Sequence, residues 1–259
     1  GLNRSMFKTL MNRFFNALAF YTRMPCPNWV DYNEESLNRA SAFFPLMGAL
    51  VAAFSFLVFW LCLHVFSIEL SLLISMIASI LFTGAFHEDG FADLCDGFGG
   101  GWQQADILRI MKDSRLGTYG VTGLLLMLLI KWQVLVDIAQ ESIGHVLFAL
   151  LAAHCISRAV SISLMLVLPY VQEDALSKAK PIAKHWYKSD MSFVWLTGLL
   201  PLVLLPWEVS LCIIAIVGFN FFWIYKWYLK RLKGYTGDAL GASQQIQEIT
   251  CYLAIAAWV

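Results

Sequence analysis

The sequence predicts an all-α integral membrane protein: a single polytopic helical bundle of about seven transmembrane helices, with an amphipathic interfacial helix at its N-terminus. Two features of composition and one of pattern support this prediction. Of the 259 residues, 59% are hydrophobic and only 14% are charged. The mean hydropathy of +0.66 is that of a membrane protein and not of a soluble globular one. Apolar stretches of spanning length recur along the whole chain, so we expect one domain over residues 1–259.

The N-terminal segment differs from the later apolar stretches because basic residues interrupt it. Residues 1–5 precede the first methionine, and we interpret them as an expression remnant. In residues 6–24, apolar side chains such as Phe7, Leu10 and Phe14 recur at helical spacing, and we expect no cleavable signal peptide there. This pattern predicts an amphipathic helix that lies on the membrane surface.

Seven transmembrane helices are then predicted, at residues 43–66, 69–87, 117–139, 144–171, 192–207, 208–229 and 237–258. The fifth is short and contains Pro201 and Pro206, which makes its boundary with the sixth the least sharply defined. The six cysteines show no C-x-x-C spacing and several fall inside spans, so we interpret them as free thiols.

Basic residues lie on one side of this predicted topology. All but two of the 18 lysines and arginines fall in residues 1–42, 88–116, 172–191 and 226–236. The positive-inside rule places these segments in the cytoplasm, with the N-terminus inside and the C-terminus outside. Within 172–191, Lys178, Lys180 and Lys184 predict contact with lipid headgroups, or attraction of an anionic substrate.

Four carboxylates lie where the second predicted span ends, in the segment His-Glu-Asp-Gly-Phe-Ala-Asp-Leu-Cys-Asp-Gly at 87–97. If this segment is helical, Asp89, Asp93 and Asp96 share one face. Carboxylates this close repel one another, and a divalent cation removes the repulsion. Oxygen ligands favour Mg²⁺, Mn²⁺ or Ca²⁺ over zinc. We therefore predict a metal site formed by Glu88, Asp89, Asp93 and Asp96. A solvated acidic loop is the alternative.

Basic side chains near this segment are candidates for binding phosphate. Lys112 and Arg115 lie at the entrance to the third span, where they could hold a polyphosphate or simply anchor the topology. Arg158 lies midway along the fourth span with His154 one turn away. A charge at that depth costs about 2.5–3.5 kcal/mol, so we expect Arg158 to face a polar cavity and to contact the ligand or the acidic cluster. Lys131, nearer the outer face, can snorkel and receives no role.

Two further segments carry polar signals. Residues 97–101, Gly-Phe-Gly-Gly-Gly, predict a flexible turn that either approaches a phosphate or serves as a linker, and residues 103–113 predict a short surface helix. In the last span, Asp238, Gln245 and Glu248 follow a helical period, and small residues at 241 and 242 allow close packing. We expect Asp238 and Glu248 to complete the metal or substrate site, with helix–helix hydrogen bonding as the alternative.

A metal held by carboxylates beside cations suits phosphoryl or phosphodiester transfer. Asp93, Asp89 or His87 would then take the proton of an attacking hydroxyl. No Ser-His-Asp arrangement or cysteine nucleophile is signalled, so direct transfer is favoured over a covalent intermediate.

Motifs in order along nearly the whole chain resemble those of the cobalamin synthase (adenosylcobinamide-GDP ribazoletransferase) family, at residues 20–25, 44–48, 86–97, 110–120 and 237–242. The resemblance implies an Mg²⁺-dependent multi-pass enzyme of the bacterial inner membrane, acting late in coenzyme B12 assembly, with no nucleic-acid partner. It would join adenosylcobinamide-GDP to α-ribazole or its 5′-phosphate and release GMP. By the same resemblance the four acids of 88–96 are metal ligands, Lys112 and Arg115 hold the diphosphate, and Asp238 closes the site.

Three other functions are alternatives. The spacing is also similar to that of CDP-alcohol phosphotransferases, but their Asp-Gly-x-x-Ala-Arg element is absent. A membrane prenyltransferase would carry a second aspartate-rich motif, whereas residues 236–242 offer one aspartate. A cation transporter would carry carboxylates at several mid-span depths, whereas here they cluster at one membrane face. Metal-dependent release of GMP separates the transferase from the last two. The oligomeric state is left open.

Overall fold

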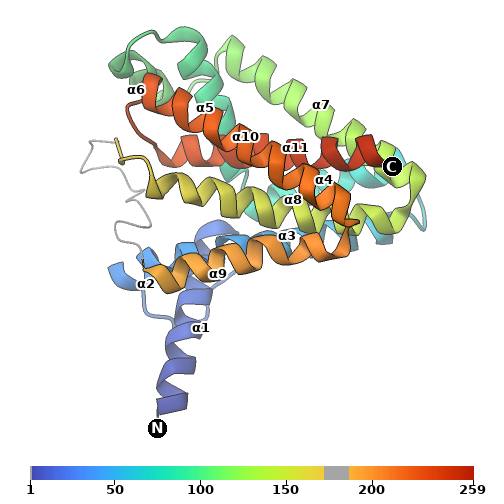
Figure 1. The fold of residues 1–259 in the computed structure, drawn as a ribbon, viewed down its shortest axis with the longest axis horizontal. Coiled ribbons are helices and arrows are strands. Elements are labelled where there is room, and N and C mark those ends of the chain that lie inside the picture. The colour runs from blue at the N-terminus through green and yellow to red at the C-terminus, as the bar shows by residue number, and fades with distance from the viewer. Residues whose placement is uncertain (1, 172–186) are drawn as a thin grey trace.

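The computed structural model describes residues 2–171 and 187–259, which form an all-α bundle (Figure 1). Most of the long helices lie side by side along one common direction. They are α3 (Phe44–Cys62), α4 (Ile68–Thr83), α7 (Thr118–Glu141), α8 (Ile143–Ser163), α9 (Lys188–Leu199), α10 (Trp207–Arg231) and α11 (Gly237–Trp258). Each matches one of the seven predicted apolar stretches. Lys178, Lys180 and Lys184 lie outside the described residues.

Four of the described helical segments are long and apolar enough to cross a membrane, or five if α4 and the following helix count as one bent span. The four are Glu34–Cys62, α7, Ile143–Leu166 and α10. The chain therefore has the fold of a membrane protein, and the count of seven stays a prediction. Two of the predicted spans differ from the rest. α9 ends at Leu199 and continues as the 3-10 helix η3 (Leu200–Leu204), whose second residue is Pro201. α11 carries many polar side chains.

α8 lies at the centre of the bundle, packed against α3, α9 and α11. Close approach to α8 depends on residues without a side chain. A Cβ on Gly48 of α3 would lie 2.4 Å from the carbonyl oxygen of His154, and one on Gly198 of α9 would meet Ala159 at the same distance. These contacts bring neighbouring backbones together, as is common between membrane helices.

The N-terminal helix α1 (Leu2–Tyr21) crosses the direction of the spanning helices instead of joining them (Figure 1). The helix predicted for residues 6–24 is thus confirmed, with its start and end shifted toward the N-terminus. Its last turn contacts the bundle, where Ala17 and Tyr21 are buried. A short helix α2 (Glu34–Ala40) follows, capped by Asn33, and leads through η1 (Ser41–Phe43) into α3.

A sharp turn after α4 sets the position of the acidic segment. Gly84 (φ 72°) and Ala85 (φ 58°) both adopt the left-handed conformation, for which glycine is the favoured residue. The chain turns by 90° here, and α5 (Phe86–Gly100) runs across the end of the bundle. Helix α5 includes residues 97–100, so the flexible turn expected there is wrong. The surface helix expected next is confirmed as α6 (Gln104–Lys112). All six cysteines are free thiols, as predicted.

Candidate active site

Three carboxylates from two distant parts of the chain converge at one end of the bundle. Asp89 and Asp93 come from α5, and Asp238 comes from the first turn of α11. One oxygen of each lies within 4.8 Å of the other two. Asp89 is exposed, whereas Asp93 and Asp238 are partly buried. Asp89 and Asp93 share a face of α5, as predicted. Asp238 joins them from the last helix, also as predicted.

Close packing of α5 on α11 brings the three carboxylates together. A Cβ on Gly90 would lie 2.7 Å from the carbonyl oxygen of Asp238, so only glycine admits the start of α11 at this place. A Cβ on Gly241, one turn further, would lie 3.3 Å from the Cα atom of His87. The hydroxyl of Thr236 accepts a hydrogen bond from the backbone N–H of Ala239 and so caps the N-terminus of α11.

The carboxylate group fits a hard divalent cation. In α5, which turns away from the spanning direction, burial and then the neighbouring Asp238 raise the pKa of Asp93. Three ionised carboxylates at this distance repel one another, and a bound cation offsets that repulsion. Mg²⁺ is commonly held by one or two carboxylates together with substrate phosphates. Asp89, Asp93 and Asp238 therefore supply a suitable donor set.

Asp96, predicted as a fourth ligand on the same face, is engaged elsewhere. Its carboxylate accepts hydrogen bonds of 2.7 Å each from the backbone N–H groups of Gly117 and Gly120, at the start of α7. Helix N-termini favour negative charge in this position. A Cβ on either glycine would lie within 2.6 Å of a carboxylate oxygen of Asp96. Asp96 thus joins α5 to α7 and does not belong to the three-carboxylate group.

Lys112 and Arg115 lie on the surface beside this junction. Lys112 is exposed at the end of α6, and the side chain of Arg115 is 88% exposed. Arg115 pairs with Asp113 at 2.8 Å, and its hydrogen bonds lower the pKa of Asp113 to about 2. Since Gly117 binds Asp96, Arg115 is only two residues from a direct contact with α5. Arg115 is thus held by Asp113 at the surface.

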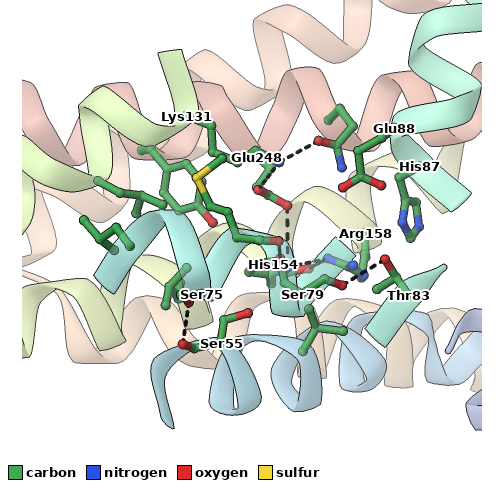
Figure 2. A pocket seen from close by; sticks show the side chains of 17 residues that line it. Ser55, Ser75, Ser79, Thr83, His87, Glu88, Lys131, His154, Arg158 and Glu248 are labelled. Carbon is green, nitrogen blue, oxygen red and sulfur yellow. Dashed lines mark hydrogen bonds and ion pairs between the residues drawn. The ribbon is translucent and has the colours of Figure 1, made fainter. Parts of the chain in front are cut away.

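Behind α5, inside the bundle, lies a polar cavity of about 30 Å³ (Figure 2). Helices α3, α4, α5, α7, α8 and α11 all contribute to its lining. The ionisable side chains among its 17 lining residues are His87, Glu88, Lys131, His154, Arg158, Glu248 and Tyr252. Polar groups at this depth are costly unless they are paired.

Most of these groups form one network. Lys131 Nζ lies 2.9 Å from Glu248 Oε2 and donates to Gln245 Oε1 at 2.6 Å. Glu248 Oε1 is 3.5 Å from Nδ1 of His154. Arg158 lies 2.9 Å from that nitrogen and also donates to the carbonyl oxygen of His154. Arg158 thus faces a polar cavity, as predicted, but it is not brought to the three carboxylates.

One interpretation of this region is wrong. Lys131 does not snorkel: it is 7% exposed and paired with Glu248. Glu248 joins this network by hydrogen bonding between helices, which was the alternative for α11, and it lies apart from the carboxylate group. The polar stripe seen in the sequence of α11 was the signal for this network, because a carboxylate and an amide buried on one helix require partners on a neighbouring helix.

His87 and Glu88 also face the cavity (Figure 2). His87 is 2% exposed and stacks on Phe44, with 5.6 Å between ring centroids. Among the described residues, neither Nε2 of His87 nor Oε2 of Glu88 has a hydrogen-bond partner. Helix α5 therefore has two polar faces: Asp89 and Asp93 point toward the start of α11, whereas His87 and Glu88 point into the bundle. The structure separates these two predicted site residues from the three-carboxylate group.

The fold and the site define a membrane-embedded helical bundle with a carboxylate site at one end. The chain belongs to the cobalamin-5-phosphate synthase family, which matches residues 13–256, and this confirms the resemblance seen in the motifs.

Three similar proteins are adenosylcobinamide-GDP ribazoletransferases from Shewanella species. That of Shewanella frigidimarina is 45% identical over 252 residues, that of Shewanella pealeana 44% over 248, and that of Shewanella oneidensis 44% over 243. The alignments cover 93–95% of this chain and 92–95% of those proteins. No solved structure matches the chain.

Proposed function

We propose that this chain transfers the cobinamide phosphate of adenosylcobinamide-GDP to the 3′-hydroxyl of α-ribazole or its 5′-phosphate, at the cytoplasmic face of a bacterial inner membrane. The observation that carries the proposal is the convergence of Asp89, Asp93 and Asp238 at one end of the bundle, in a chain whose similar proteins bear this name. The basic segments 88–116 and 226–236 meet beside α5, where Arg231 donates to the carbonyl oxygens of Phe98 and Gly101, which supports the cytoplasmic orientation.

The reaction exchanges one phosphorus–oxygen bond for another. The ribazole hydroxyl oxygen bonds to the phosphorus attached to cobinamide, the bond from that phosphorus to the GMP oxygen breaks, and GMP leaves with its electron pair. The hydroxyl proton must be taken up as the new bond forms. Asp89 is the exposed member of the carboxylate group, so we propose it as the first acceptor of that proton.

The chain's own residues bind and orient the diphosphate. Mg²⁺, held by Asp89, Asp93 and Asp238, would supply positive charge against the diphosphate. Lys112 and Arg115, on the surface beside the start of α7, would bind its remaining oxygens. Arg158 of α8 lines the cavity behind α5, into which His87 points, and we propose that it supports α5 from that side.

The test is release of GMP by the purified protein in liposomes that contain adenosylcobinamide-GDP and α-ribazole 5′-phosphate. We expect GMP and a cobalamin product in equal amounts with Mg²⁺, and neither product with EDTA or with Asp93→Asn. Asp106→Asn, which removes the same charge from an exposed position on α6, should keep full activity. No turnover by folded protein refutes the transferase, and turnover that survives EDTA refutes the metal site.

A further inference from the structure

A second pocket, of about 590 Å³, lies where α1 meets the start of α9. Its volume is in the range of small-molecule sites. The apolar part of its lining comes from three elements: α1, η1 and α9. These side chains are Leu10, Met11, Phe14, Ala42, Phe43 and Phe193. Arg13, Arg39 and Asp190 are the charged residues at the same pocket.

Three aromatic rings form a continuous wall of this corner pocket. The ring of Phe43 is 6.0 Å from that of Phe14 and 5.2 Å from that of Phe193, both in edge-to-face geometry. Such pairs hold rings in defined orientations. The wall therefore offers a fixed apolar surface that spans from α1 to α9.

The two guanidinium groups at the pocket differ in their partners. Arg39 forms a bidentate pair with Asp190, at 3.0 and 2.8 Å, and lies 4.3 Å from the ring centroid of Tyr187. Arg13 is partly buried and forms no ion pair with a carboxylate in the described part of the chain. Burial, and then the charge of Arg39, lower the pKa of Arg13. A bound anion would therefore be stabilised mainly by the charge of Arg13, because that of Arg39 is already paired with Asp190.

The position of the pocket indicates the kind of anion. Helix α1 leaves the bundle across the direction of α9 (Figure 1). The pocket is lined by residues of both helices and so lies in the corner where they meet. Met6 and Phe7, on the free part of α1, are 60% and 64% exposed. A helix of this type lies at the headgroup level of a membrane. Ala42 and Phe43 belong to the segment Glu34–Cys62, which is long and apolar enough to cross the membrane, so its first part passes the same level.

We propose that the corner pocket binds an anionic phospholipid, with the lipid phosphate on Arg13 and an acyl chain against the wall of Phe14, Phe43 and Phe193. Charge-assisted bonds from arginine to phosphate supply the headgroup contact. The wall supplies the apolar contact. A phosphate of the reacting substrates is a poorer occupant. Helix α1 contacts α5 at Phe20, whose ring is 5.7 Å from that of Phe86, about 10 Å of helix beyond Arg13.

The test is the lipid retained by the protein after purification from nanodiscs of mixed phosphatidylglycerol and phosphatidylcholine, measured by native mass spectrometry. Arg13→Gln should retain about fivefold less phosphatidylglycerol, the effect expected for one basic residue near an anionic surface. Retained phosphatidylcholine should not change. Arg4→Gln removes the same charge from an exposed site on α1 outside the pocket, and it should behave like the unmodified chain.

Two more variants guard against a folding defect. Arg13→Lys keeps the charge and should retain an intermediate amount of phosphatidylglycerol. Leu10→Glu places a carboxylate at the partly exposed edge of the pocket and should also lower phosphatidylglycerol. Equal retention by Arg13→Gln and Arg4→Gln overturns the site, whether both are high or both low. Displacement of the lipid by glycerol phosphate alone overturns the lipid occupant and indicates a soluble phosphate ligand.

Discussion

Replacing one partner of the buried Lys131–Glu248 ion pair should destabilise the bundle more than replacing both. The two side chains are 9% and 2% exposed, so neither remaining charge can turn to water. Removing one member of a buried pair typically costs about 3–5 kcal/mol, whereas replacing both by apolar side chains is often close to neutral. The unfolding equilibrium constant should therefore rise on the order of a hundredfold or more in a single variant, and much less in the double variant.

Because the two residues have different neighbours, the two single variants should lower the stability by different amounts. Glu248→Met leaves Lys131 and Arg158 as cations in the cavity without a counter-charge from α11. Lys131→Met leaves Glu248 near Arg158 and 3.5 Å from the ring nitrogen of His154. We expect Glu248→Met to be the more destabilising by about 1 kcal/mol, the scale of one intramolecular hydrogen bond.

The assay is equilibrium unfolding by SDS in mixed micelles, followed by circular dichroism, for the unmodified chain, both single variants and the double variant. The difference between the double variant and the sum of the singles gives the coupling energy of the pair, which we expect to exceed about 3 kcal/mol, because each single costs about 3–5 kcal/mol and the double costs less than either. Lys230→Met, at an exposed position of α10, is the control. Single variants within about 0.5 kcal/mol of the unmodified chain, or additive effects, would refute the reasoning.

Three further substitutions test how α5 is held. Gly90→Val should abolish GMP release while leaving helix content unchanged, because its Cβ would lie 2.7 Å from the Asp238 carbonyl; normal turnover would contradict this. Asp96→Asn should lower stability by about 1–3 kcal/mol in the same SDS assay, since an amide supplies only one acceptor oxygen for the two N–H donors of α7; an unchanged midpoint would count against it. Arg231→Met removes hydrogen bonds of 3.0 and 2.7 Å to two carbonyls at the end of α5. Faster hydrogen exchange should then be confined to that end, and uniform exchange would argue otherwise.

Helix positions could be predicted closely because hydropathy alone marks the apolar stretches. Every predicted span corresponds to a helix, and α11 matches its predicted range to within one residue at either end. Whether each helix crosses the membrane is a different matter. The polar residues of α11 are hidden by its neighbours, which a count of apolar residues in one segment does not register.

The site was predictable where it depended on spacing within one helix. Asp89 and Asp93, four residues apart, lie on one face wherever the segment is helical. Sequence reasoning did not predict that His87 and Glu88 point into the bundle. The left-handed turn at Gly84 and Ala85 sets the rotation of α5 about its axis, and with it the direction of these side chains. Asp96 binds backbone N–H groups at the N-terminus of α7. This contact joins segments about twenty residues apart, and no local sequence pattern predicts it.

The polar interior of α11 has a consequence for how the protein enters the membrane. Gln245 and Glu248 bind Lys131 of α7, Gln244 binds Ser157 of α8, and Gln247 donates to the carbonyl oxygen of Val217 in α10. Alone in lipid, this helix would expose a carboxylate and several amides to hydrocarbon. We therefore expect the insertion machinery to release it into the bilayer only after α7 and α8 have assembled. A truncated chain without α11 would in turn leave Lys131 without its counter-ion, which would make it a substrate for membrane quality control.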